Sequence, residues 1–255
     1  MNTVSIVEYT EIDLSNALVV IAFPSVGLVG SIAGSFIVKQ LELEEIGMIH
    51  SPDFLPVTII HNGKPSPPVR LYASKKKCGP NGSCEQLAVV LSEFAPPPKT
   101  IRALADTLLW WAQTKKCKII LTLEGMQIPK REDNYESKIF GVGSTPGIKK
   151  ILKKNGIIPT KEGIIVGLSG VLLLEGAVQK RDIICMLAET QTAYPDSRAA
   201  ARLLEKIDKL LPLIKIEAEP LYKEAEEIEK KITQYIKTSK TASSSLSTTP
   251  SSMYR

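Results

Sequence analysis

The strongest constraint on this chain is a repeated alternation, from Leu14 to Asp208, between short apolar runs and longer segments with helical spacing. The run Leu18–Phe23 (LVVIAF) contains no polar residue, as expected for a strand that is buried on both faces of a sheet. Similar runs recur at Cys117–Gly125 (CKIILTLEG) and Arg181–Thr190 (RDIICMLAET). Strands separated by helices pair in parallel through right-handed crossovers. The sequence therefore predicts an α/β fold with helices on both faces of a mixed, mostly parallel sheet.

Three local patterns add detail to this prediction. The pair Asn62-Gly63 is a strong β-hairpin signal, and residues 67–74 (PPVRLYAS) are predicted as the return strand. Residues 162–170 (EGIIVGLSG) are predicted as a strand that runs into a turn. A helix is predicted between Thr145, as its capping residue, and Gly156, as its terminating glycine.

Composition limits the classes of function. With 255 residues, 44% of them hydrophobic, the chain can bury a core large enough for one large domain or two modest ones. The net charge of +5 is lower than dedicated nucleic-acid binders usually carry. The lysine clusters, such as Lys75–Lys77 and Lys149–Lys154, lack interleaved aromatic residues, so solvated surfaces are favoured over a nucleic-acid site.

The N-terminal residues carry acidic side chains early and lack the basic segment of a secretory signal. The longest apolar runs are too short to cross a bilayer. We therefore expect a cytoplasmic protein that has no membrane partner.

The pattern changes after Thr190. Pro195 and Asp196 mark the start of a helix, whose apolar stripe must cover a partner helix, the sheet or another subunit. A second helix begins near Leu221 and carries apolar residues at steps of four and three. The predicted organisation is a core domain over residues 1–192, a helical hairpin over 193–238 and a flexible tail, rich in serine and threonine, over 239–255.

Motifs for catalysis are scarce. No nucleophile elbow, metal-binding helix or phosphate-binding loop occurs, and His50 and His61 have no motif around them. We expect no cofactor and no metal. Glu93 and Glu124 each lie near the end of a predicted strand, where ligands bind in open α/β sheets. With Arg70 they could line a crevice, but a structural salt bridge or a contact between subunits is the favoured interpretation.

A glycine-rich stretch follows the first buried strand and opens a helix. Gly27, Gly30 and Gly34 could expose backbone N–H groups to an anion, or they could let the helix pack closely on the sheet or on a neighbouring subunit. Both interpretations remain open, with close packing favoured, because the spacing matches neither the dinucleotide-binding nor the nucleoside-triphosphate-binding motif.

The four cysteines fall into two pairs. Cys117 and Cys185 lie in or beside apolar runs and are predicted to be buried. Cys78 and Cys84 flank a turn, and three alternatives stay open for them: free thiols, a local disulfide or two ligands of a metal site.

Six segments in this order resemble the proteasome assembly chaperone family in its archaeal form, over roughly Ala17 to Tyr235. The segments are VVIAFPSVGLVGSIAGSFIVKQL, VTIIHNGKPSPPVRLY, VVLSEFAPP, FGVGSTPGIKKIL, GLSGVLLLEG and YPDSRAAARLLEKI. The resemblance implies an α/β fold related to nucleoside phosphorylases, a helical C-terminal extension, homo-oligomers and no established catalytic activity.

The tail ends in Met253, Tyr254 and Arg255, although a serine- and threonine-rich segment has no core in which to bury the first two. The residues are either accidental or suited to a pocket on a partner. They match the hydrophobic–tyrosine–any-residue (HbYX) pattern with which proteins that bind the proteasome often end. The resemblance implies that the tail enters pockets in the α-ring of the 20S proteasome. Some archaeal members of the family lack this pattern, so the implication depends on the tail itself.

Three hypotheses follow. The favoured one is a non-enzymatic, homo-oligomeric adaptor that binds the proteasome α-ring through its C-termini. The alternatives are a nucleoside-phosphorylase-like or hydrolase enzyme that uses the crevice near Gly27, Glu93 and Glu124, and a basic nucleic-acid-binding module.

Overall fold

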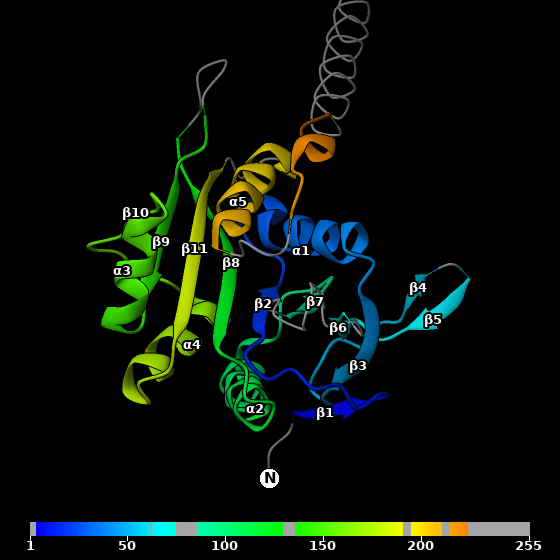
Figure 1. Ribbon diagram of the computed structural model, residues 1–255. Helices are drawn as coiled ribbons and strands as arrows, with labels where there is room; N and C mark the ends of the chain where they lie inside the picture. Colours follow the sequence, from blue (N-terminus) through cyan, green and yellow to red (C-terminus); the bar gives the residue numbers. More distant parts are fainter. Residues whose placement is uncertain are drawn as a thin grey trace, which may run out of the picture.

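The computed structural model describes residues 4–61, 63–74, 86–129, 136–190, 195–210 and 215–223. Within these residues, nine strands form one sheet in the order β1-β3-β6-β7-β2-β8-β11-β9-β10 (Figure 1). The strands are β1 (Ser5–Glu8), β2 (Leu18–Ala22), β3 (Glu44–His50), β6 (Val69–Ala73), β7 (Leu87–Ser92), β8 (Ile119–Gln127), β9 (Ile139–Gly143), β10 (Ile158–Pro159) and β11 (Ile183–Thr190).

The centre of the sheet is parallel. β2 pairs in parallel with β7 and β8, and β8 pairs in parallel with β11. Antiparallel strands flank this centre, because β1, β3, β6 and β7 run alternately on one side and β9 runs against β11 on the other. The predicted mixed α/β fold is therefore confirmed, with its parallel pairing concentrated where strands are buried on both faces.

Helices cover both faces of the sheet, because each central strand is apolar on both sides. Along β2, Leu18, Val20 and Ala22 point into one hydrophobic cluster, whereas Val19 and Ile21 point into the other. The first cluster is completed by α1 (Val29–Gln40), α3 (Pro146–Lys154) and α5 (Ser197–Leu210), and the second by α2 (Ile101–Thr114) and α4 (Gly167–Val178).

Local signals place several helix ends correctly. The Thr145 hydroxyl accepts a hydrogen bond from the Ile148 N–H at 3.3 Å, and Gly156 adopts a positive φ of 65° after α3. The Asp196 carboxylate accepts a hydrogen bond from the Ala199 N–H at 2.9 Å at the start of α5. Two short 3₁₀ segments, η1 (Val26–Leu28) and η3 (Pro98–Thr100), lead into α1 and α2.

The hairpin prediction was wrong about the return strand. β4 (Ile59–His61) pairs with β5 (Lys64–Ser66) as a separate two-stranded sheet that projects from the body (Figure 1). The apolar run predicted as the return strand instead forms β6, where Val69, Leu71 and Ala73 are buried between β3 and β7. A tight turn at Gly63 favours immediate pairing of its neighbours, and the core takes the more apolar segment.

The strand predicted at 162–170 is also absent. Residues 163–166 have no regular secondary structure, and α4 begins at Gly167. Ile164 and Val166 are 90% and 77% exposed, so they do not pair within a sheet despite their apolar, β-branched side chains. An apolar run of this length is typical of a buried strand. Among the described residues, however, no strand pairs with residues 163–166.

The stripe on α5 covers the sheet domain. Leu203, Leu204 and Ile207 are buried in the same cluster as α1 and the central strands. Residues 219–223 begin a second helix, and the rest of the predicted hairpin and tail lies outside the described residues. The boundaries proposed at 192 and 238 stay predictions.

No helix among the described residues is both long enough and apolar enough to cross a membrane.

Candidate functional site

The glycine-rich loop lies at the carboxyl end of β2, against the start of α5. Gly27 adopts a positive φ of 64°, and a Cβ atom there would lie 2.4 Å from Thr190 Oγ1. The Gly27 carbonyl accepts a hydrogen bond from the Asp196 N–H at 2.8 Å. The loop is therefore fixed by the chain that follows β11.

Gly30 and Gly34 bring α1 into direct contact with the strands below it. A Cβ atom at Gly30 would lie 2.5 Å from the Leu123 carbonyl oxygen, and one at Gly34 would lie 2.2 Å from Ala22 Cβ. Such contacts account for the absence of side chains at both positions. An anion-binding role for these glycines stays a prediction.

Glu124 forms a polar cluster beside the glycine loop. Its carboxylate accepts a hydrogen bond from the Ser169 hydroxyl of α4 at 2.5 Å and is hydrogen-bonded to Ser25. The Ser25 Oγ accepts hydrogen bonds from the Gly125 N–H at 3.1 Å and from the Gly30 N–H at 3.4 Å. Burial raises the pKa of Glu124 to about 7, although the bonds from Ser169 and Ser25 act in the opposite direction. A carboxyl group with this pKa exchanges its proton near neutral pH and can act as a general acid or base.

The structure does not join Glu93 to this cluster. Glu93 forms an ion pair with Arg70, whose side chain is buried between β3 and β7. Glu93 directly follows β7, Glu124 lies in β8, and β2 lies between these two strands, which are therefore roughly 10 Å apart. The salt-bridge interpretation therefore fits Arg70 and Glu93, and Glu124 belongs to a different site.

The histidines and cysteines lie elsewhere. His50 is exposed at the end of β3, and His61 ends β4. Cys185 is fully buried in β11, and burial raises its thiol pKa to about 12; partly buried Cys117 has its pKa raised to about 11 by the same cause. Cys78 and Cys84 lie outside the described residues. In the part of the chain that the structure describes, no group of three or more His, Cys, Asp or Glu side chains is placed to hold a metal ion.

The described part of the C-terminal segment is anchored on the face formed by α1 and α5. Ile216, Ala218 and Leu221 are buried in the core cluster of that face. The Ile216 N–H donates to Asp208 Oδ1 at 2.7 Å, and Gln40 Nε2 donates to the Glu217 carbonyl at 3.2 Å. These contacts hold residues 215–223 against α1 and α5 (Figure 1).

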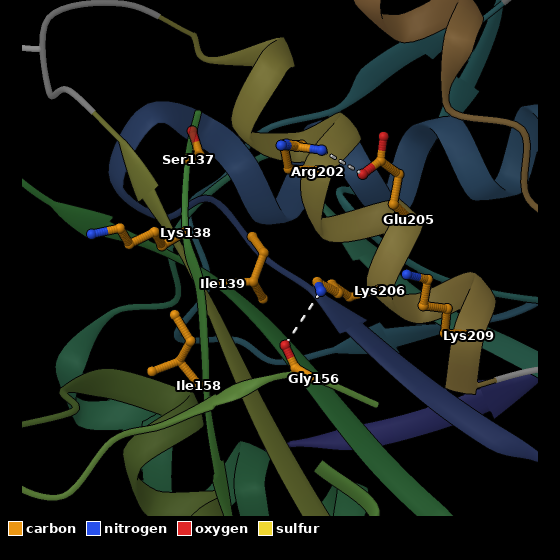
Figure 2. A pocket seen from close by; sticks show the side chains of 9 residues that line it. All are labelled: Ser137, Lys138, Ile139, Gly156, Ile158, Arg202, Glu205, Lys206 and Lys209. Carbon is orange, nitrogen blue, oxygen red and sulfur yellow. Dashed lines mark hydrogen bonds and ion pairs between the residues drawn. The ribbon is translucent and has the colours of Figure 1, made fainter. Parts of the chain in front are cut away.

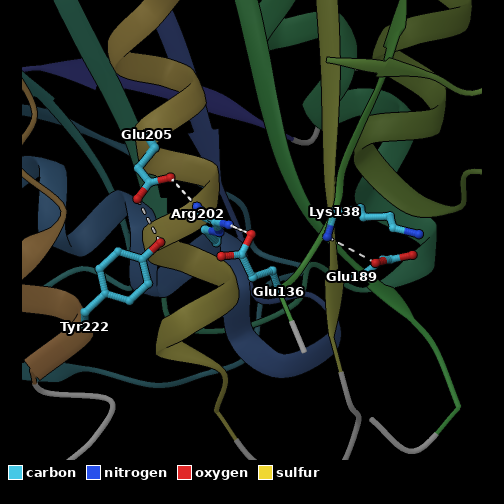
Figure 3. A network of polar contacts seen from close by, with 6 residues as sticks. All are labelled: Glu136, Lys138, Glu189, Arg202, Glu205 and Tyr222. Carbon is cyan, nitrogen blue, oxygen red and sulfur yellow. Dashed lines mark hydrogen bonds and ion pairs between the residues drawn. The ribbon is translucent and has the colours of Figure 1, made fainter. Parts of the chain in front are cut away.

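A network of charged side chains continues this anchor. The Tyr222 hydroxyl donates to Glu205 Oε1 at 2.9 Å, Glu205 accepts from Arg202 at 3.0 Å, and Arg202 pairs with Glu136 (Figure 3). Burial, followed by the bond to Glu205, raises the pKa of Tyr222, so the phenol remains a donor at neutral pH. Nearby, the Lys138 N–H donates to Glu189 Oε2 at 3.0 Å.

A pocket of about 240 Å³ lies between α5 and the β9–β10 edge, next to this network. Figure 2 shows α5 side chains on one side of it and residues of β9, β10 and the turn at Gly156 on the other. Lys206 Nζ donates to the Gly156 carbonyl at 3.3 Å. The lining residues are Ser137, Lys138, Ile139, Gly156, Ile158, Arg202, Glu205, Lys206 and Lys209. Its four cationic side chains against one carboxylate make this a basic part of the surface.

Sequence reasoning identified Glu124 but missed its serine partners and the anchor around Tyr222. Ser25, Ser169 and Glu205 lie in three separate segments that carry the family resemblance, but no local pattern marks them as hydrogen-bond partners of Glu124 or Tyr222. Met253, Tyr254 and Arg255 lie outside the described residues, so their docking role stays a prediction.

The fold and the anchored segment define a class of α/β protein. Its sheet has a parallel centre and antiparallel flanks, and its C-terminal segment is anchored on one face of the sheet. A family model described as the PAC2 family matches residues 19–236. The chain belongs to the PAC2 family, and the resemblance to proteasome assembly chaperones is confirmed.

Relatives and solved structures agree with this assignment. The chain is 34% identical over 232 residues to an uncharacterised protein of Methanocaldococcus jannaschii, covering 91% of this chain and 90% of that protein. The crystal structure of Pyrococcus furiosus PbaA, described as an archaeal homolog of proteasome-assembly chaperone, matches with a TM-score of 0.83, 29% identity and 96% coverage of both chains. Pyrococcus furiosus PbaB, described as an archaeal proteasome activator, matches with a TM-score of 0.80, covering 92% of this chain and 99% of that one; at 23% identity it supports the fold alone.

Proposed function

We propose that this protein is a non-enzymatic, homo-oligomeric adaptor whose C-terminal tails bind pockets in the α-ring of the 20S proteasome. The observation that carries the proposal is the sequence Met253-Tyr254-Arg255 behind a serine- and threonine-rich segment. Membership of the PAC2 family supports it, as does the likeness to PbaA, described as a homolog of proteasome-assembly chaperone.

The chemistry of the tail suits capture by a pocket. A terminal carboxylate on Arg255 provides an anion for a lysine in the pocket and fixes the register of the peptide. Tyr254 supplies a rigid aromatic body with a polar tip, and Met253 supplies an adaptable thioether. The proposal requires that the natural protein carry a free α-carboxylate on Arg255. The mass of the intact purified protein tests this requirement.

Several weak contacts are expected to act together. Three residues bind weakly alone, so affinity comes from several tails of one oligomer on one ring. A flexible chain of the length of residues 239–252 has a root-mean-square end-to-end distance of roughly 20 Å. A tether of this reach would accommodate a mismatch of symmetry between two rings. The anchor of residues 215–223 on α5 gives each tether a fixed starting point.

The test is co-migration of the full oligomer with purified 20S proteasome. Removal of residues 253–255 is expected to abolish binding, and Tyr254→Ala is expected to weaken it at least tenfold. Adding two residues after Arg255 keeps every side chain but moves the carboxylate, so it is also expected to abolish binding. Ser251→Ala serves as the matched control and should bind normally. Unchanged binding by the truncated protein would reject the docking role.

A second candidate function, a nucleoside-phosphorylase-like or hydrolase enzyme, is favoured by the Glu124 cluster, in which a carboxyl group with a pKa of about 7 is bonded to two serine hydroxyls. Nucleosides and nucleotides at millimolar concentration are the appropriate ligands for a thermal-shift screen. Stabilisation of the parent protein that is lost in Glu124→Gln would support this alternative, whereas no shift would argue against it.

A further inference from the structure

Helix α4 is apolar around most of its circumference, with Ser169 and Glu175 as its polar residues. Its sequence, GLSGVLLLEGAV, includes Glu175 as its one charged residue. Leu168 and Leu172 are buried against α2 and the sheet. On the other side of the helix, Leu174 and Val178 are 58% and 70% exposed. A helix that is apolar around most of its circumference is normally covered on most sides, so the outer side of α4 lacks its cover in the single chain.

The preceding loop extends this surface. A Cβ atom at Gly170 would lie 2.2 Å from the Ile165 carbonyl oxygen, so the loop lies directly on the helix at this glycine. Gly170, Leu174 and Val178 follow at steps of four and therefore share one stripe. Ile164 and Val166, on either side of Ile165 in this loop, are 90% and 77% exposed. We call these four exposed residues, Ile164, Val166, Leu174 and Val178, the α4 patch.

The size of the α4 patch suits a stable contact. The four residues together expose roughly 500 Å², an area comparable with the largest apolar patch on a typical monomer. Each partner in a standard interface contributes about 800 Å². The α4 patch therefore supplies more than half of one side of such an interface, and none of its four side chains carries a charge.

The chemistry of the patch favours a permanent partner. A surface that binds a transient partner is exposed to water while the partner is absent and is therefore more polar. An obligate interface is more hydrophobic and resembles a domain core cut in half. A second copy of this chain is the partner that is always present at matching concentration.

The location of the patch favours the same partner. α4 covers the sheet face opposite to α1, α5 and residues 215–223, as shown by the two separate core clusters and by Figure 1. Association through α4 therefore leaves the C-terminal segments unobstructed on the other face, as a protein with several docking tails requires.

We infer that the α4 patch is the surface through which copies of this chain associate. The inference extends the proposed function, from which it takes the homo-oligomer, by assigning the contact to named residues. Its test measures the oligomer alone and does not depend on the tail residues.

The test is the mass of the full-length protein by native mass spectrometry and light scattering. The parent protein is expected to be a multiple of the single-chain mass, and the double variant Leu174→Glu, Val178→Glu is expected to fall to the single-chain mass. Both side chains are exposed in the single chain, so the variant should still fold, which far-ultraviolet circular dichroism checks. A milder variant, Leu174→Ser, should dissociate at a concentration at least tenfold higher than the parent.

Ile60→Glu provides the matched control. Ile60 is 67% exposed on the projecting β4–β5 hairpin, away from the α4 patch, and its substitution should leave the oligomer intact (Figure 1). The inference is overturned if the parent is monomeric, if the folded double variant keeps the parent mass, or if Ile60→Glu dissociates the oligomer equally. None of these measurements involves the proteasome. If tail truncation abolishes binding to the ring but the α4 double variant keeps the parent mass, only this inference is rejected. If truncation leaves binding unchanged but the α4 double variant falls to the single-chain mass, only the docking role is rejected.

Discussion

Gly30 shows how one missing side chain sets the distance between a helix and a sheet. A Cβ atom there would lie 2.5 Å from the Leu123 carbonyl and 2.8 Å from the Phe23 carbonyl, and both contacts are with backbone atoms that cannot rotate away. The contact is thus determined by atoms from β8 and from the end of β2. A sequence pattern of glycines indicates close packing but does not name these neighbours.

Gly30→Ala is expected to lower the free energy of unfolding by about 1–3 kcal/mol, because the added methyl group overpacks a site closed by backbone. Urea unfolding followed by circular dichroism measures the change. Gly147→Ala is the matched control, since its nearest neighbour, Thr145 Oγ1, would lie 3.8 Å from the new Cβ atom. This control should be neutral or slightly stabilising. Equal destabilisation by both substitutions would contradict the packing argument.

Glu124 gives a pH dependence with a definite sign. Its pKa is raised by burial from 4.5 to about 7, so between these values the folded state keeps a proton that the unfolded state releases. Stability is therefore expected to fall as pH rises from about 4.5 to about 7 and to level off above that, by roughly 1–3 kcal/mol in total.

Glu124→Gln removes the ionisable group and should flatten this slope. Urea unfolding at pH 5, 6, 7 and 8 measures it, and Glu11→Gln, at an exposed position, is the control that should retain it. A variant that keeps the full slope would show that another group causes the dependence.

At the scale of elements, the attachment of residues 215–223 to α5 is the feature closest to the proposed function. Side chains of α5 bond to this segment at two points, Asp208 to the Ile216 N–H and Glu205 to the Tyr222 hydroxyl. The apolar stripe of α5 predicted a buried helix, and Leu203, Leu204 and Ile207 confirm it. The polar contacts that hold the following segment carried no signal in the sequence.

Tyr222→Phe removes the hydroxyl but keeps the ring. The loss is expected to cost about 1 kcal/mol locally, because Glu205 loses one donor. Amide hydrogen exchange should rise roughly fivefold at residues 215–223 and stay unchanged in the central strands. Tyr9→Phe, which changes a half-exposed residue directly after the edge strand β1, is the control. Unchanged exchange at 215–223 would indicate that apolar contacts alone hold the segment.

At the scale of the whole molecule, the two proposals place docking and self-association on opposite faces of the sheet. One face carries α1, α5 and the start of the C-terminal segment, and the other carries α2 and α4 with their exposed apolar patch. Docking and self-association can therefore be altered independently. The tail variants should weaken binding to the ring without changing the mass of the oligomer. The α4 variants should act directly on the oligomer and lower its mass.

The sequence by itself determined the α/β class, most strand and helix positions and the capping of α3 and α5, because hydrophobic periodicity and capping chemistry are local. It also singled out Glu124, but the expectation that this residue lies near the end of its strand was wrong, because β8 continues past it to Gln127 in pairing with β11. Only the tertiary structure decided that residues 69–73 join the main sheet, that 163–166 form no strand, and that Ser25, Ser169 and Glu124 meet. These outcomes depend on which segments become neighbours, and burial and hydrogen bonding between distant segments are not encoded in the spacing of residues along the chain.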